Sequence, residues 1–296
     1  MPHVTGLVAR VATVCTEMGD LDGAIEAYND LLERLLGTDG MRDATTQVRR
    51  LLDDSLDKNE RQGILRALGC ANKLAETYEA RGQRSKRRSA VLPHARAAST
   101  ADADMAAQWY GWCLQLVMLT YQNHFNHQQL ADNKPTTQTP SFDPDTLPSY
   151  FPVDIVTSLM YNAATFYSSN AQIELAEPLL QRALDLMRHG ADGDETNVCR
   201  SSILMSHLAN TGVMSGNLAA AERWSIDGLA LAKRFPNNAD CLNSFIALTY
   251  DLGVVYEASG SLESARVQYR QAAEIATSTG DDDAAKLASE AMTRLA

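Results

Sequence analysis

The segment YDLGVVYEASGSLESARVQYRQA, from Tyr250 to Ala272, decides the fold of this chain. Small residues recur along it at regular places, and it holds no cluster of side chains that could do chemistry; the small residues are Gly253, Gly260, Ala265 and Ala272. Two helices that cross closely need small side chains at the contact, larger ones beside them and a glycine where the chain turns. The spacing therefore predicts a packed pair of helices.

The same spacing recurs 44 residues upstream of Leu252-Gly253, at Leu208-Ala209, and again 45 residues before that, at Ala163-Ala164. The earlier copies start at four pairs of residues: Leu208-Ala209, Ala163-Ala164, Leu74-Ala75 and Val11-Ala12. In the copy that starts at Leu74, the expected second helix RSKRRSAVLPHAR has Arg87 where a small residue belongs. We therefore predict four regular helix pairs and a fifth that is altered.

This pattern resembles the tetratricopeptide repeat (TPR) family, which has Gly or Ala after Leu, an aromatic residue three positions later, and Gly at the turn. The spacers HGADGDETN (189–197) and FPNNADC (235–241) lengthen the period. The result is similar to the long-repeat subgroup that includes kinesin light chains. The resemblance implies an all-α, right-handed superhelical TPR solenoid of antiparallel helix pairs. The amphipathic end TGDDDAAKLASEAMTRLA supplies the capping helix that a solenoid needs.

Composition agrees with an all-α chain and excludes several functions. Of the 296 residues, 45% are hydrophobic, and most of these are Ala and Leu, which favour helices over strands. The net charge of −11 argues against general nucleic-acid binding, which needs a basic face. No apolar run reaches the roughly 18 residues of a membrane span.

The five cysteines are widely spaced and include no CxxC or zinc-site pattern. We interpret them as small buried hydrophobic residues with reduced thiols. Reduced thiols imply a reducing or neutral compartment, so we predict an intracellular location, either cytoplasmic or mitochondrial.

Three regions are predicted along the chain. Residues 1–100 form TPR-like helix pairs with an extra helix at 41–62. Residues 101–152 hold a long apolar helix, 105–130, without an evident TPR-type partner, and then a proline-rich insertion, 131–152, that we expect to be a surface loop. Residues 153–296 form three TPR repeats and the capping helix.

No pattern of residues predicts an enzyme. His124 and His127 form an HxxH without a third ligand nearby, and we interpret them as a polar helix end. Phosphate loops, nucleophile motifs and kinase motifs are missing. We predict no catalytic residue, no metal site and no cofactor. The basic residues of 81–96 could meet an acidic peptide or anionic lipid, or form a solvated helix face.

The resemblance to TPR proteins implies that the first helix of each pair lines a concave groove, through residues that share one helix face. The predicted groove residues are Asn72, Ser158, Tyr161, Asn162, Thr165, Ser206, His207, Asn210, Tyr250, Val254 and Glu257. Asn162, His207 and Asp251 take the same position of the repeat. Asparagine amides suit peptide main chain, although ordinary polar lining is an equal alternative. The positions of a chaperone-type carboxylate clamp hold Ala9, Thr13, Ser158 and Asn162, so binding of such acidic tails is not expected.

These patterns predict a non-enzymatic adaptor or scaffold that binds a peptide or helical segment of a protein partner. A weaker resemblance to TPR adaptors of the mitochondrial inner-membrane AAA protease implies recruitment of substrates to a larger complex. The alternative is a structural assembly factor or obligate oligomer that uses helix 105–130 as its interface. We expect a protein partner, no nucleic acid, no membrane span, and a monomer or a member of a larger complex.

Overall fold

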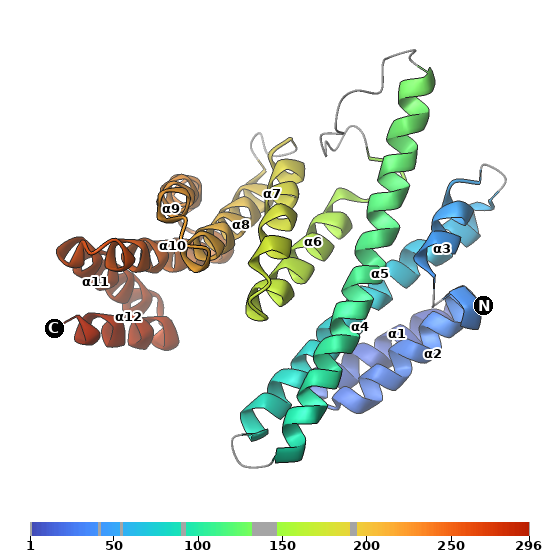
Figure 1. The fold of residues 1–296 in the computed structure, drawn as a ribbon, viewed down its shortest axis with the longest axis horizontal. Coiled ribbons are helices and arrows are strands. Elements are labelled where there is room, and N and C mark those ends of the chain that lie inside the picture. The colour runs from blue at the N-terminus through green and yellow to red at the C-terminus, as the bar shows by residue number, and fades with distance from the viewer. Residues whose placement is uncertain are drawn as a thin grey trace. The chain divides into compact units, whose positions relative to one another are not determined.

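The computed structural model describes residues 2–40, 43–53, 56–89, 93–131, 147–189 and 194–295. Within these ranges the chain is helical and has no strand, which confirms the all-α prediction (Figure 1). No helix in these ranges is long and apolar enough to cross a membrane. The chain divides into two compact units, Met1–Phe166 and Tyr167–Ala296.

The first unit is built on two long helices that pack side by side, α4 (Lys58–Ser89) and α5 (Pro93–Ala131). The predicted N-terminal pair is α1 (Pro2–Met18) and α2 (Leu21–Gly40), and α2 packs on α4. The expected extra helix is α3 (Ala44–Leu51), which packs against α4 and α5. The helix α6 (Val153–Ser169) begins in this unit and ends in the second.

The repeat pattern predicted that the segment RSKRRSAVLPHAR forms the second helix of the altered copy. The structure shows that it does not form a separate helix. Helix α4 continues to Ser89 and α5 starts at Pro93, so the segment spans the end of one helix and the start of the next. Helix α5 then runs through residues 100 and 101, where the sequence suggested a boundary between regions. The partner of the first helix of this copy is therefore α5 itself.

Two of the basic residues in 81–96 hold helices together. The guanidinium of Arg81 donates to both carboxylate oxygens of the buried Asp102, at 2.6 to 3.2 Å, and to Asp22 at 2.5 Å. The Arg84 Nη1 donates to the carbonyl oxygen of Gly19 at 2.8 Å. These contacts join α4 to α5 and to the α1–α2 turn, so this part of the basic run is structural. The side chains of residues 87–96 lie outside the described residues.

Helix α5 does have a partner within the chain, contrary to the expectation for helix 105–130. Its large apolar side chains are buried, and they include Trp109, Tyr110, Trp112, Leu116, Val117 and Tyr121. They pack where α5 meets α3 and α4, and the Tyr110 ring lies 5.3 Å from the Phe166 ring of α6. Because this surface is already covered, it is not available as the interface that the alternative function required.

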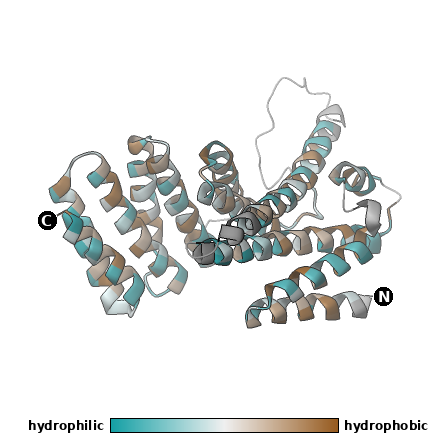
Figure 2. Cartoon of the chain, turned by 60° about the horizontal axis from the view of Figure 1, so that its bottom comes forward, coloured by the Kyte–Doolittle hydropathy of each residue, from teal (hydrophilic) through white to brown (hydrophobic). Residues whose placement is uncertain are grey.

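The second unit holds the second helix of the first predicted C-terminal repeat and the two repeats that follow it. Its helices are α7 (Ile173–His189), α8 (Glu195–Met214), α9 (Leu218–Ala232), α10 (Ala239–Ala258), α11 (Leu262–Thr279) and α12 (Asp282–Arg294). Each helix packs on the next, and α8 also packs on α10, the first helix of the following pair. Apolar and polar stretches alternate along these helices, as expected of amphipathic helices (Figure 2). Helix α12 covers α11 and is the expected cap.

Glycines mark the closest approaches between helices of this unit. A Cβ added to Gly253 in α10 would lie 2.6 Å from Cε1 of Tyr269 in α11, because the ring covers the glycine. A Cβ on Gly212 would lie 3.0 Å from the Cβ of Ala221. Gly212 stands where the repeat pattern expects an aromatic residue, and the close approach of α9 explains the exchange.

Among the described residues, the turns α1–α2, α6–α7, α8–α9 and α10–α11 each contain a residue in the left-handed conformation. Gly19, Gly216 and Gly260 have φ values of 80°, 78° and 80°. In the turn between α6 and α7 the corresponding residue is Ala171, with φ 59°. A residue with a Cβ pays about 1–2 kcal/mol for this conformation, so glycine is the expected residue at the other three turns.

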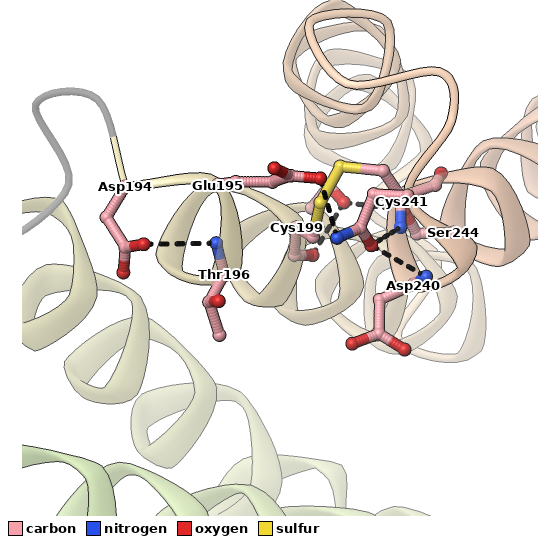
Figure 3. Close-up of a disulfide and its surroundings, with 9 residues drawn as sticks. Asp194, Glu195, Thr196, Cys199, Asp240, Cys241 and Ser244 are labelled. Carbon is pink, nitrogen blue, oxygen red and sulfur yellow. Dashed lines mark hydrogen bonds between the residues drawn. A yellow bond between two sulfur atoms is a disulfide. The ribbon is translucent and has the colours of Figure 1, made fainter.

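A disulfide joins α8 to α10 near their N-terminal ends, between Cys199 and Cys241 (Figure 3). Beside it, Asn238 donates to Glu195 at 2.9 Å, and the hydroxyls of Ser202 and Ser244 are 2.5 Å apart. The prediction of reduced thiols is therefore wrong for this pair, while Cys15, Cys70 and Cys113 are free. Because disulfides persist in oxidising surroundings, the cysteines no longer support a reducing compartment, and the cellular location stays a prediction.

We expect Gly253→Ala to lower the free energy of unfolding by about 1–3 kcal/mol, because the new methyl group would displace the Tyr269 ring. Urea denaturation followed by circular dichroism measures the change. Gly63→Ala in α4 is the matched control, since nothing lies within 4 Å of its added Cβ, and it should gain up to about 1 kcal/mol from helix propensity. Equal effects of the two substitutions would contradict the packing argument.

We expect the unfolded, unreduced chain to expose three reactive thiols and the reduced chain five. Reduction should lower the free energy of unfolding by about 2–4 kcal/mol, because the cross-link restricts the unfolded chain. Thiol titration in denaturant and urea denaturation with and without dithiothreitol measure both quantities. The Cys199→Ser/Cys241→Ser variant should be insensitive to dithiothreitol; five thiols without reductant would rule out the bond.

Candidate functional site

A pocket of about 410 Å³ opens in the second unit between α8, α10 and α12. Its lining residues come from these three helices, with one contribution from α11: Asn210, Val213, Asn243, Ile246, Ala247, Tyr250, Asp251, Val254, Ala272, Asp281, Ala284 and Leu287. The two longer walls are first helices of consecutive pairs, which is the face that the repeat pattern assigned to a groove. The capping helix supplies the third wall.

Helical spacing explains why these residues share one cavity. On α10 the residues Asn243, Ala247, Tyr250 and Val254 follow one another at intervals of three or four, so they lie on one side of the helix. On α12 the same applies to Asp281, Ala284 and Leu287. The pocket therefore follows from the lining faces of α8, α10 and α12 and from the packing of α10 with the other two helices.

The apolar part of the lining is anchored to the core below. The Tyr250 ring packs on the Tyr269 ring with centroids 5.1 Å apart, and Val254 packs against the cluster that contains Tyr269 and Ala291. Leu287 is 50% exposed on the opposite wall. The pocket thus combines an apolar floor, packed on the core, with the exposed apolar side chain of Leu287.

Asp251 is the most perturbed titratable group of the pocket. Ser206 of α8 donates to its Oδ2 at 2.6 Å. Burial raises the pKa of the Asp251 carboxyl from 3.8 to about 7, although the Ser206 hydroxyl acts in the opposite direction. The carboxyl group is therefore close to its midpoint of ionisation at neutral pH.

Glu257, another predicted groove residue, is engaged in holding the cap. The Tyr269 hydroxyl donates to its Oε2 at 2.6 Å, and Arg294 of α12 donates to both carboxylate oxygens at 2.9 and 3.2 Å. The Arg294 guanidinium and then the Tyr269 hydroxyl lower the pKa of the Glu257 carboxyl. Glu257 therefore links its own helix, α10, to α11 and α12. It is not one of the residues that line the pocket.

The three asparagines of the predicted groove do not share one site. In the first unit, Asn72 and Asn162 both donate to Oε1 of Glu76, at 3.0 and 2.6 Å, and Lys73 contacts the other oxygen of that carboxylate at 2.6 Å. Each of these two amides thus donates a hydrogen bond within the fold. Asn210 is the predicted asparagine that lines the pocket, where it is exposed. The sequence did not single out Glu76, which links the other two.

The remaining predicted groove residues have varied surroundings. The Thr165 hydroxyl donates to the carbonyl oxygens of Tyr161 and Asn162 in its own helix, and Ser158 is exposed. Burial raises the pKa of Tyr161 and lowers the pKa of His207. Ser206 lies behind the pocket, where it holds Asp251.

The structure therefore brings Asn210, Tyr250 and Val254 into one pocket, with Ser206 bound to Asp251 next to them. Sequence reasoning missed Asn243, Asp281 and Leu287 as lining residues. Asn243 lies seven residues before Tyr250 on the same helix face, so extending the groove pattern would have found it. Asp281 and Leu287 belong to a segment that the sequence identified only as a cap.

A metal centre has little support among the described side chains, where no group of three or more His, Cys, Asp or Glu residues could hold an ion. His124 is one of the described residues, whereas the side chain of His127, the second histidine of the HxxH, lies outside them. Burial raises the pKa of the Cys70 thiol to about 11, so this thiol is a poorer nucleophile than an ordinary cysteine at neutral pH.

Comparison with solved structures shows which known proteins share this fold. No protein-family model matches the sequence, and no curated protein matches it. Among solved structures, BtubC (BKLC) from P. vanneervenii aligns with a TM-score of 0.57 and 16% identity over 94% of this chain and 84% of that one. A variant of a kinesin light chain-like protein with nearly identical TPR-like repeats, from Podosopora anserina, aligns with a TM-score of 0.54 and 14% identity over 95% and 100% of the two chains.

The chain thus has the fold of a helical repeat solenoid. More particularly, it is similar to TPR-like repeat proteins that include a kinesin light chain-like one, as the small-residue spacing predicted. At these identities the likeness concerns the fold. The resemblance to mitochondrial protease adaptors is not part of this finding and stays a prediction.

The raised pKa of Asp251 gives a prediction for stability. Between about pH 4 and pH 7 the folded state binds more protons at this group than the unfolded state does, so stability falls as the pH rises through this window. Asp251→Asn removes the titration and keeps an acceptor for Ser206. We expect it to raise the free energy of unfolding by about 2 kcal/mol more at pH 8 than at pH 5.

Urea denaturation of wild type and variant at the two pH values measures this difference. Other titrating groups, such as His207, are common to both proteins and cancel in the comparison. Asp240→Asn, which removes a carboxyl group from an exposed position of the same helix, is the control for the loss of one charge. A gain that does not depend on pH would show that Asp251 is ionised throughout.

Proposed function

We propose that the chain is a non-enzymatic scaffold that binds a segment of a protein partner in the pocket between α8, α10 and α12. The single observation that carries the proposal is the composition of this pocket, with exposed Asn210 and Asn243 beside an apolar floor and an exposed Leu287. Amide side chains can donate to and accept from peptide main chain, and the apolar surface can bury side chains.

The size of the pocket favours a short segment. Small-ligand sites have volumes of about 300–1,000 Å³, and this pocket is at the lower end of that range. It can take a few side chains of an extended or helical segment, which leaves the rest of the partner outside. The TPR-like fold supports the proposal, since consecutive first helices form the two longer walls.

An adaptor role, in which the bound partner is a substrate for a larger complex such as a mitochondrial protease, rests on the sequence resemblance alone. The competing role of an assembly factor has weaker support, because the apolar residues of α5 are buried inside the first unit. We therefore assign partner binding to the second unit.

Selection of displayed random 12-residue peptides on the immobilised full chain tests the proposal. We expect selected peptides to bind Asn210→Ala/Leu287→Ser at least about tenfold more weakly than wild type, since both substitutions remove contacts at exposed positions of the pocket. Fluorescence polarisation of labelled peptides measures the affinities.

Leu175→Ser is the matched control, because Leu175 belongs to the same unit, is 51% exposed and does not line the pocket. It should bind the peptides as well as wild type does. Failure to select any peptide, or equal binding by the pocket variant, would reject the proposal.

A further inference from the structure

The charged groups of the pocket all have one sign. Among the described residues that line it, Asp251 and Asp281 are acidic and none is lysine, arginine or histidine. The two carboxylates come from different walls, α10 and the start of α12. Asp282 and Asp283, which follow Asp281, are exposed and add negative charge near the same helix end. A ligand therefore meets an unbalanced negative field in this pocket.

Asp251 differs from the other carboxylates that the fold uses. Glu257 is paired with Arg294 and Glu76 with Lys73, so each has a cation of the protein beside it. At Asp251 the hydrogen bond comes from the Ser206 hydroxyl, and burial, without a compensating cation, governs its ionisation. A partly buried carboxylate next to a cavity is stabilised when a cation enters that cavity.

Asp281 is held in place while it keeps capacity for a ligand. Its Oδ1 accepts from the backbone N–H of Ala284 at 3.0 Å and so caps α12. The Oδ2 atom is not part of this bond. Because the cap determines where the side chain points, the carboxylate is positioned before a ligand arrives.

The apolar lining suits the same kind of ligand. Val213, Ile246, Val254 and Leu287 lie beside the two carboxylates in the pocket. Lysine and arginine have aliphatic stems that pack on apolar surface and a charged end that needs an acceptor. An acidic side chain would meet repulsion here, and a purely apolar one would bring no cation to either carboxylate.

We propose that the pocket receives a lysine or arginine side chain of the partner segment, whose cationic end pairs with Asp251 and Asp281 and whose stem lies on the apolar lining. This inference rests on the proposed function and adds the chemical class of the partner: a basic segment. The net charge of −11 would assist the approach of such a segment at low ionic strength.

The test uses the displayed 12-residue peptides as probes, at pH 8, where Asp251 is mostly ionised. We expect selected sequences to be enriched in lysine or arginine. Replacing the critical basic residue of a selected peptide by glutamine should weaken its binding to wild type by about 10- to 100-fold. The same replacement should have little effect on binding to Asp251→Asn/Asp281→Asn, because the coupling partner is gone.

Both substitutions preserve the fold by design. Asparagine is as good an N-cap as aspartate, and it can still accept the Ser206 hydrogen bond. Asp283→Asn is the matched control, since it removes an exposed carboxylate of the same helix turn that does not line the pocket. For this variant the loss on glutamine replacement should equal that of wild type.

The outcomes separate the inference from the proposed function. Peptides that lose affinity for Asn210→Ala/Leu287→Ser but show no basic enrichment, or no coupling to the two aspartates, would overturn the inference and leave the function standing. If no peptide depends on the pocket, both fail. If the effect of glutamine replacement falls as much for Asp283→Asn as for Asp251→Asn/Asp281→Asn, the basic enrichment reflects general attraction to an acidic chain, which also overturns the inference.

Discussion

The contact of the Tyr269 ring with Gly253 is the constraint on which the rest of the second unit depends. The ring can cover α10 at this point because the glycine has no side chain. From this position the ring supports Tyr250, and its hydroxyl reaches Glu257, which in turn binds Arg294 of the cap. One missing Cβ thus determines the distance between α10 and α11 and the floor on which the pocket is built.

A second set of contacts holds the other wall. The disulfide between Cys199 and Cys241, the serine pair and the Asn238–Glu195 hydrogen bond join α8 to α10 near their N-terminal ends. Further along the same two helices, Ser206 bonds Asp251. The register between the first helices of two repeats is therefore set by covalent and polar contacts, while packing sets the register within a pair. As a result, the Asp251 carboxylate lies between α8 and α10, and these contacts hold both helices in place.

Much of the fold could be predicted because its signals are local. A helix pair is encoded within about 25–30 residues by small residues at the crossing and a glycine at the turn, so α8 with α9 and α10 with α11 were identified from spacing. The altered helix pair, which starts at Leu74, was harder to predict from the sequence. Its second helix is α5, which starts later than the pattern suggests and is held to α4 by Arg81 and Asp102. Such an ion pair leaves no periodic signal in the sequence.

The sequence by itself determined the all-α repeat architecture, the cap and the side of the first helices that bears Asn210, Tyr250 and Val254. It did so because helical periodicity places those residues on one face, whatever packs on them. Only the tertiary structure decided that Asp251 meets Ser206, that Cys199 meets Cys241 and that Asp281 closes the pocket. Each of these contacts depends on the register between helices that are separated by a turn or by a whole repeat, and that register follows from the summed packing of many side chains, which no short stretch of sequence contains.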